Sequence, residues 1–276
     1  MYYCRLVVYS GVRSGGIKDG VTETPYENIS DAVEAASPGS TITVGAGEYT
    51  EAFVIDKALT INGDTGAKII GTNKEFVVDI SASGVTLNGL EIVCGDSETE
   101  SAAIVLRFQN FAGSSPVTIT NCVLNGNMTA SNRIEGCGNL ANGALIVEGN
   151  IIKNFTYEGI NLYEHLDEIA EPSLTFQNNE IYNDHVEEQL SYGIDLDADQ
   201  LTNTIIIEGN KIKSLYSSLY FNYVYETTVE ITGNEMTSYD DACMHLRIFK
   251  LPVVPGFPAA GAAPGRCSNT AQTQSS

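Results

Sequence analysis

Apolar and polar residues alternate in short runs along most of the chain, and similar runs recur at intervals. Five segments share an alternating stretch followed by Asn, one further residue and an apolar residue. They are VTITNCVLNG (117–126), ALIVEGNIIKNF (144–155), SLTFQNNEIYND (173–184), TIIIEGNKIKSL (204–215) and TVEITGNEMTSY (228–239). Strict alternation is typical of a strand with one buried face. Each segment therefore predicts two short strands joined by a bend.

The asparagines of these segments indicate how the units stack. They are Asn121, Asn150, Asn179, Asn210 and Asn234, spaced 29, 29, 31 and 24 residues apart, with Gly63 and Gly89 at the same place in two earlier segments. Asn and Gly tolerate the left-handed backbone conformation of a sharp bend, and stacked Asn side chains can hydrogen-bond in a ladder. A unit of about 25–30 residues cannot bury its apolar face alone, whereas stacked units can. The pattern predicts an all-β fold, a parallel β-helix.

A second strand is expected between successive Asn segments. These strands are SAAIVLRF (101–108), GINLYEHL (159–166), GIDLDADQ (193–200), SLYFNYV (218–224) and ACMHLRI (242–248). Alternation predicts that their inward side chains form a continuous core. The inward residues would be Ile104, Leu106, Ile160, Leu162, Ile194, Leu196, Leu219, Phe221, Met244 and Leu246.

The two ends of the chain differ from the repeats. A short amphipathic helix is predicted at about 28–37, capped by Asn28 or Ser30. Its apolar residues would plug the open end of the solenoid, because terminal units need caps; they are Ile29, Ala32, Val33 and Ala36. We therefore expect a poorly defined segment at 1–24, a β-helix at 25–249 and a disordered or linker-like tail, rich in Pro, Ala, Gly and Ser, at 250–276.

The N-terminal residues AVEAASPGSTITVGAGEYTEAFVIDKALTINGD resemble the opening rung of right-handed β-helix proteins of the pectin lyase-like superfamily. The Asn segments are similar to the parallel β-helix repeats of that group, and the resemblance covers residues 25–249. It implies a single-stranded right-handed parallel β-helix. It implies no particular activity, because the superfamily contains lyases, hydrolases, esterases, epimerases, phage tailspikes and non-catalytic surface proteins.

Signatures of individual enzyme families are incomplete. The pectin methylesterase motifs are absent, and the chain has no tryptophan. GIDLD (193–197), YDDACMHL (239–246) and RIFK (247–250) are similar to motifs of polygalacturonase-type hydrolases. However, Ser-Tyr replaces Thr-Asp before Gly193, and the Gly-His-Gly motif is missing. No specific enzyme family is matched, and a non-catalytic role is favoured.

Composition narrows the choice of partner. With 14 Lys and Arg against 35 Asp and Glu, the formal charge is −21, so the chain would repel nucleic acid. No apolar run is long enough for a membrane-spanning helix, and no signal peptide is recognised at the start, so any export signal has been removed or lies outside this chain. The six cysteines form no C-x-x-C pair, which disfavours zinc and iron–sulfur sites. Buried thiols are expected, with one or two disulfides left open.

Polar side chains gather on the outward face when the second strands are stacked. Following the superfamily, in which the equivalent sheet often lines a saccharide groove, this strip would bind polysaccharide. The candidate contacts are Arg107, Asn161, Tyr163, His165, Asp199, Tyr220, Asn222, His245 and Arg247. Tyr163 and Tyr220 would stack on sugar rings, while Asn and Asp would bind hydroxyl groups.

Asp195 and Asp197 are the candidate catalytic pair. As same-face neighbours on a strand they would lie about 6.5–7 Å apart, at the lower end of the range for inverting glycoside hydrolysis. Three interpretations stay open for these aspartates: a solvated surface, sugar or cation binding, and catalysis. No cofactor or metal ligand is assigned, although together with Asp199 they could hold calcium.

The sequence thus predicts an extracellular or cell-surface protein that binds polysaccharide or serves as an adhesive or structural stalk. The alternative is a lyase or glycoside hydrolase that acts on acidic polysaccharide through outward carboxylates. We expect a monomer or a part of a longer chain.

Overall fold

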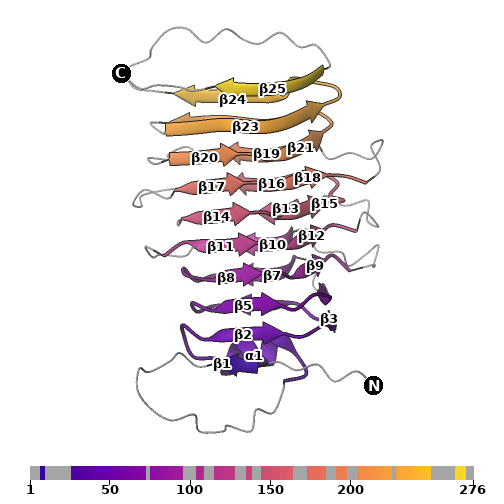
Figure 1. The fold of residues 1–276 in the computed structure, drawn as a ribbon, viewed down its shortest axis with the longest axis vertical. Coiled ribbons are helices and arrows are strands. Elements are labelled where there is room, and N and C mark those ends of the chain that lie inside the picture. Colours follow the sequence, from indigo (N-terminus) through magenta and orange to yellow (C-terminus); the bar gives the residue numbers. More distant parts are fainter. Residues whose placement is uncertain are drawn as a thin grey trace.

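The computed structural model describes residues 7–9, 26–72, 75–95, 104–108, 115–127, 135–138, 144–163, 173–184, 191–197, 204–225, 228–249 and 265–271. Its described part is nearly all β, with one short helix and a parallel β-solenoid whose strands stack along the long axis (Figure 1). The predicted fold class, a parallel β-helix with a short N-terminal helix, is confirmed.

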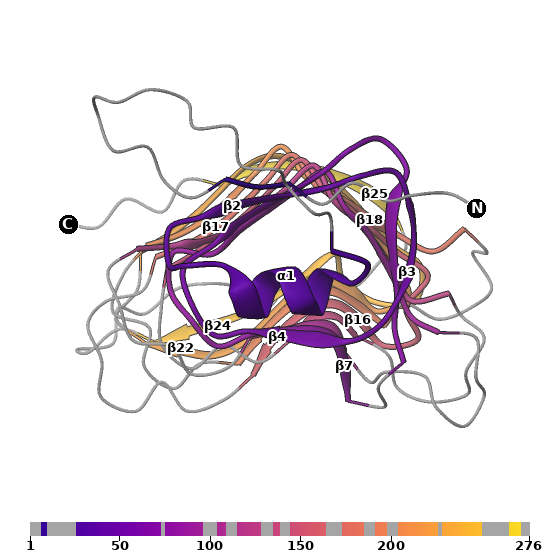
Figure 2. The same cartoon turned by 90° about the horizontal axis from the view of Figure 1, so that it is seen from below.

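The solenoid has three faces, which are visible end-on in Figure 2. The first face contains β2 (Thr41–Val44), β5 (Thr60–Gly63), β8 (Thr86–Asn88), β11 (Val117–Thr120), β14 (Leu145–Glu148), β17 (Leu174–Gln177), β20 (Thr204–Glu208) and β23 (Thr228–Ser238). The second face contains β3 (Gly47–Thr50), β6 (Ala67–Ile70), β9 (Glu91–Val93), β12 (Val123–Asn125), β15 (Ile151–Lys153), β18 (Glu180–Tyr182) and β21 (Lys211–Ser214). The long strand β23 pairs with both β20 and β21 and so runs along both faces.

The third face is an eight-stranded parallel sheet, and it carries the candidate site. Its strands are β4 (Phe53–Ile55), β7 (Phe76–Ile80), β10 (Ile104–Phe108), β13 (Glu135–Gly138), β16 (Glu158–Tyr163), β19 (Tyr192–Asp197), β22 (Ser217–Tyr225) and β24 (Met244–Phe249). They follow one another in the sheet in chain order. Chemical groups far apart in the sequence are thereby placed on adjacent strands.

The predicted inward residues of this sheet form the core, with one exception. Those from Ile104 to Phe221 are buried, and Met244 packs against them half-buried. Leu246 was expected to be buried, but 38% of its surface is exposed. It lies on β24, the last strand of the sheet, where no further rung among the described residues covers it.

A ladder of buried asparagines joins successive turns where the first and second faces meet. Its members are Asn150, Asn179, Asn210 and Asn234. Both the backbone N–H and the Nδ2 group of each of the first three donate to Oδ1 of the next, over 2.9–3.0 Å. Each Nδ2 group also donates to a backbone carbonyl of the preceding turn. Buried amides are stable only when satisfied in this way.

The predicted ladder is wrong at Asn121. Strand register pairs Thr120 with Glu148, so the ladder position in this turn is Cys122, whose N–H donates to Asn150 Oδ1. The left-handed bend lies one residue before the ladder position, at Gly89, Asn121, Gly149, Asn178, Gly209 and Gly233, with φ between 53° and 71°. The bend position and the ladder position are thus adjacent in the chain, and Asn is suited to both.

Helix α1 (Ile29–Ala35) lies across the N-terminal opening (Figure 2). Its predicted apolar residues are buried in the core. Asn28 occupies the predicted N-cap position, but its side chain makes no capping hydrogen bond. Instead the Glu51 carboxylate accepts hydrogen bonds from the backbone N–H groups of Ile29, at 2.7 Å, and Ser30, at 2.9 Å. A carboxylate from the next rung therefore neutralises the helix N-terminus.

Short antiparallel strands cover edges at both ends of the solenoid. β1 (Val7–Tyr9) pairs with β2, and β25 (Gly265–Ala271) pairs with β23. Both lie in segments expected to be poorly defined or linker-like. Their sequences carry too few alternating positions to signal a strand, and the edges of β2 and β23 supply the missing hydrogen-bonding partners.

The described cysteines Cys94, Cys122, Cys137 and Cys243 are buried thiols. Burial raises the pKa of Cys122 to about 11 and raises the pKa of Cys137 further. These thiols pack as small apolar groups. Among the described residues, the single short helix is far from the length needed to cross a bilayer.

Candidate functional site

One outward column of side chains runs along the eight-stranded sheet. Register places its members opposite one another on adjacent strands, and they are Asp79, Arg107, Gly138, Asn161, Asp195, Tyr220 and His245. Rungs of a parallel sheet lie about 4.8 Å apart. The sequence-predicted residues Arg107, Asn161, Asp195, Tyr220 and His245 therefore share one line along the solenoid.

A second column begins three residues earlier in each strand and was not predicted. It contains Glu158, Tyr192 and Ser217, which are in register with one another. Glu158 reaches outward to Asn161, and Tyr192 reaches outward to Tyr220. Strict alternation would turn both residues inward.

Gly159 and Gly193 explain why alternation fails here. A Cβ at Gly159 would clash with the core residue Ile181, and a Cβ at Gly193 would clash with Ile212. Both glycines therefore face the interior, as do the residues that follow them, Ile160 and Ile194. Because two successive residues face inward, the preceding residue turns outward. The recurrent Gly-Ile at 159–160 and 193–194 is the signal that could have revealed this second column.

Glu158 is a buried carboxylate at the centre of the site. Only 1% of its surface is exposed, and Asn161, at 3%, donates from Nδ2 to Glu158 Oε2 over 2.6 Å. Asn161 Oδ1 and the hydroxyl of Ser217, a residue with 1% exposure, are also buried, and neither has a hydrogen-bond partner within the described part of the chain. Asp195 is half-buried and lies between Asn161 and Tyr220. Hydrogen-bond acceptors thus concentrate on β16, β19 and β22.

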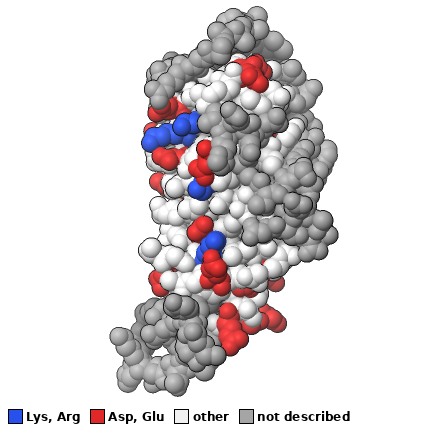
Figure 3. Space-filling view, turned by 90° about the vertical axis from the view of Figure 1, so that its right-hand side faces the viewer, with Lys and Arg blue, Asp and Glu red and all other residues white. Residues whose placement is uncertain are grey.

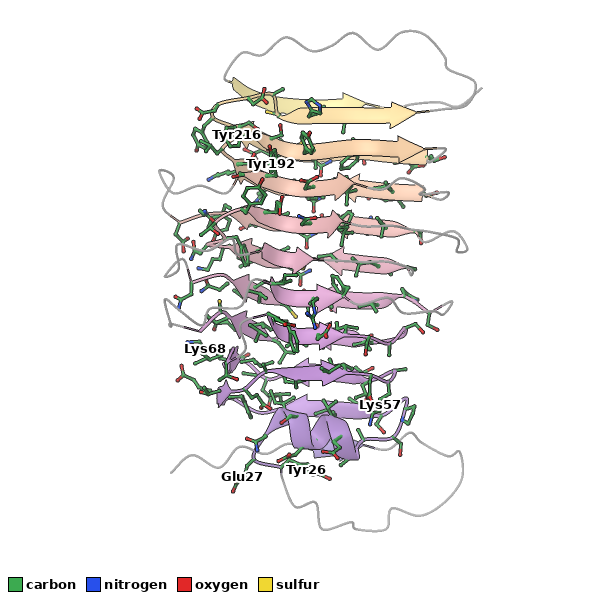
Figure 4. The ribbon with its side chains drawn as sticks, turned by 180° about the vertical axis from the view of Figure 1, so that it is seen from behind. Tyr26, Glu27, Lys57, Lys68, Tyr192 and Tyr216 are labelled. Atoms are coloured by element: carbon green, nitrogen blue, oxygen red, sulfur yellow. The ribbon has the colours of Figure 1, made fainter. Side chains whose placement is uncertain are left out.

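Five aromatic rings border these acceptors, and we call them the aromatic platform. They are Tyr157, Tyr192, Tyr216, Tyr220 and His245. The Tyr192 ring lies 5.0 Å from Tyr220 and 6.0 Å from Tyr216, which is next to it in Figure 4. Tyr220 stacks on His245 at 4.8 Å, with 23° between the ring planes. The ring contacts therefore run from Tyr157, next to β16, to His245 on β24.

The pKa of Tyr192, a member of the aromatic platform, is influenced by the neighbouring carboxylates. Burial raises the pKa of Tyr192, and the neighbouring Tyr157, Tyr220, Asp195 and Glu158 raise this pKa further. The raised pKa strengthens the preference of the Tyr192 phenol for its protonated form, which is a hydrogen-bond donor.

Arg107, at the N-terminal part of the column, is held by an ion-pair cluster. Its Nη2 lies 2.7 Å from Oδ2 of the buried Asp79, and its Nη1 lies 3.1 Å from Glu75. The guanidinium also lies 4.3 Å from the centre of the Phe76 ring. The hydrogen bond with Asp79 is the main cause of the raised pKa of Arg107. Two of its donor groups are thus occupied within the fold.

Several predicted contacts are only partly placed. Tyr163, Asp197 and Asn222 are in register on β16, β19 and β22, but their side chains, like that of Arg247 on β24, lie outside the described structure. His165 and Asp199 lie wholly outside the described residues. No cluster of three or more potential metal ligands occurs among the described side chains. The Asp195–Asp197 pair and the calcium site both stay predictions.

Lysines described on the solenoid rungs lie on a different face. Lys68, Lys153 and Lys211 belong to the second face, where they pair with Glu48, Asp184 and Glu180 over 3.1–3.2 Å. This side is turned toward the viewer in Figure 3. These three lysine side chains are thereby kept apart from the acceptors of β16, β19 and β22.

Comparison with curated proteins found no match. The family described as "Protein of unknown function (DUF1565)" matches residues 14–238, which is well over half of the 276-residue chain. The protein, a parallel β-solenoid with an acidic and aromatic outward face, therefore belongs to this family.

Proposed function

We propose that the protein binds polysaccharide on the outward face of its eight-stranded sheet. The observation that carries the proposal is the aromatic platform, in which Tyr192, Tyr216, Tyr220 and His245 form consecutive ring contacts over three successive strands. Tyrosine combines an apolar ring face with a polar tip. Such rings can stack on sugar rings while their hydroxyl groups bind sugar hydroxyls.

The shape of the fold supports an extended ligand. Rungs repeat about every 4.8 Å along the axis, and a solenoid presents a long, rigid surface. Hydrogen-bonding groups lie beside the rings at Asn161 and Asp195. A polymer that lies along the axis would therefore meet stacking surfaces and hydrogen-bonding groups together.

The resemblance to the pectin lyase-like superfamily gives further support, because its members often bind saccharide on the equivalent sheet. An extracellular or cell-surface location, where polysaccharides are abundant, is the setting we propose. A rigid solenoid that binds glycan in this setting could also act as an adhesive stalk.

Binding to a panel of neutral, acidic and amino polysaccharides, measured by isothermal titration calorimetry, tests the proposal. Tyr220→Ala should weaken binding of every glycan that binds, because it removes the ring between Tyr192 and His245. Tyr182→Ala is the matched control, because Tyr182 lies on the second face. Equal losses in both variants, or no binding of any glycan, would refute the proposal.

Catalysis is the competing function, and the same panel distinguishes it. The half-buried Asp195 carboxylate, between the amide of Asn161 and the ring of Tyr220, is the observation that favours it. Released reducing ends or unsaturated uronates that disappear in Asp195→Asn would identify a polysaccharide-degrading enzyme. Binding without any product supports a non-catalytic protein.

A further inference from the structure

The ligand chemistry can be narrowed from the groups that surround the platform. Glu158, Asp195, Asn161 Oδ1 and Ser217 Oγ lie on three adjacent strands, and all can accept hydrogen bonds. Asn161 Oδ1 and Ser217 Oγ are buried with no partner in the described structure. A buried polar atom that lacks a partner is costly, so it marks a place where a ligand can supply the missing contact.

The negative charge beside the aromatic platform favours a cationic ligand. Glu158 and Asp195 contribute carboxylates, while Lys68, Lys153 and Lys211 are paired on the second face and Arg107 is engaged by Asp79 and Glu75. The tyrosine rings add their own preference, because the face of an aromatic ring attracts a positive charge. A polyuronate would bring carboxylates against these groups, at an electrostatic cost.

We propose that the platform binds a polysaccharide of protonated amino sugars, whose ammonium groups are received by Asp195 and the tyrosine rings, with the buried Glu158 carboxylate adding negative charge behind them. This inference rests on the proposed saccharide-binding function and names its ligand class. An ammonium carries three donors and no acceptor, which matches the acceptors of the site. Calcium or magnesium instead prefers a shell of six or more oxygens without aromatic rings.

Matched oligosaccharides test the inference directly. Glucosamine tetramers, N-acetylglucosamine tetramers and galacturonate tetramers would be titrated into the full chain. We expect the glucosamine tetramer to bind about tenfold more tightly than the acetylated one, because acetylation removes the charge. Its affinity should also fall with added salt, and the galacturonate tetramer should bind more weakly than either.

Two variants separate this inference from the proposed function. Asp195→Asn keeps the shape of the side chain and removes its charge, so it should weaken glucosamine binding about tenfold and weaken binding of the acetylated tetramer much less. Tyr220→Ala should weaken both ligands. Circular dichroism and the unfolding midpoint would establish that each variant is folded.

Several outcomes would overturn the inference. If acetylated or galacturonate tetramers bind as tightly as glucosamine and Tyr220→Ala still weakens them, the inference fails and the proposed function stands. If no saccharide binds, both fail. Spermine and calcium chloride serve as further probes: Asp195-dependent binding of either one, without saccharide binding, would identify a simple cation site.

Discussion

Asn179 Oδ1 accepts two hydrogen bonds from Asn150, one from its backbone N–H and one from its Nδ2 group, each 3.0 Å long. Asn179 Nδ2 in turn donates to the Val147 carbonyl at 2.8 Å. One buried side chain thus satisfies polar groups of two turns, and the same relationship recurs at Asn210 and Asn234. The ladder is consequently a major determinant of stacking between the first and second faces.

Replacing Asn179 with Ala should destabilise the protein by about 2–4 kcal/mol, because buried donors on Asn150 and the Val147 carbonyl lose their partner. Urea denaturation would measure the free energy of unfolding. Asn178→Gly is the control, since Asn178 has a left-handed backbone with φ of 55°, which Gly adopts readily. Equal destabilisation by the two substitutions would show that the ladder does not contribute as described.

The sequence reveals the repeat but not the register of every turn. Asn150, Asn179, Asn210 and Asn234 align correctly with one another. In the turn that holds Asn121 the asparagine occupies the bend, and Cys122 takes the ladder position. Asn suits both positions chemically, so only the strand pairing of Thr120 with Glu148 distinguishes them.

Only some residues of the candidate site were predicted, because the prediction relied on strict alternation along each strand. Outward positions that follow strict alternation, such as Asn161, Asp195 and Tyr220, were found from the pattern. Glu158 and Tyr192 were missed, because each is followed by two consecutive inward residues, which breaks the strict alternation. Side-chain contacts such as the Asn161–Glu158 hydrogen bond depend on that break in the alternation.

Gly193 should not tolerate a side chain. An added Cβ would lie 2.6 Å from the Ser218 carbonyl oxygen and would clash with Ile212. Gly193→Ala should therefore destabilise the protein by about 1–3 kcal/mol and displace Tyr192, which thermal unfolding and tyrosine fluorescence would detect. Gly39→Ala is a useful comparison, because Gly39 has positive φ but no atom within 4 Å of an added Cβ. A larger loss at Gly39 would mean that backbone strain outweighs the clash.

Glu51 should stabilise α1 from outside the helix. Glu51→Ala removes the acceptor of the Ile29 and Ser30 N–H groups, and we expect a loss of about 1 kcal/mol in thermal unfolding experiments. Glu48→Ala is the matched control, because Glu48 forms an exposed ion pair with Lys68 on the neighbouring rung. Such pairs contribute little, so a loss at Glu48 that equals the loss at Glu51 would contradict the capping role.

Arg107 should contribute to folding stability, because it compensates the charge of the buried Asp79 carboxylate. Arg107→Gln leaves the buried Asp79 carboxylate without its cation and should destabilise the protein by about 3 kcal/mol. Asp79→Asn in the same chain should recover most of this loss, because the uncompensated charge is then removed. A double-mutant cycle in urea would measure the coupling, and additive effects of the two substitutions would show that the ion pair is not the cause.

Tyr192 should make the free energy of unfolding depend on pH in the alkaline range. Its pKa is raised in the folded protein, first by burial and then by neighbouring groups, so the folded state holds the phenolic proton more tightly than the unfolded state does. This contribution is fully present below the ordinary tyrosine pKa of about 10 and is lost as pH rises through the folded value. The free energy of unfolding should therefore fall more steeply above pH 10 in the parent protein than in Tyr192→Phe. Urea titrations from about pH 8 to 11 would compare the two proteins, and parallel profiles throughout would exclude Tyr192 as the titrating group.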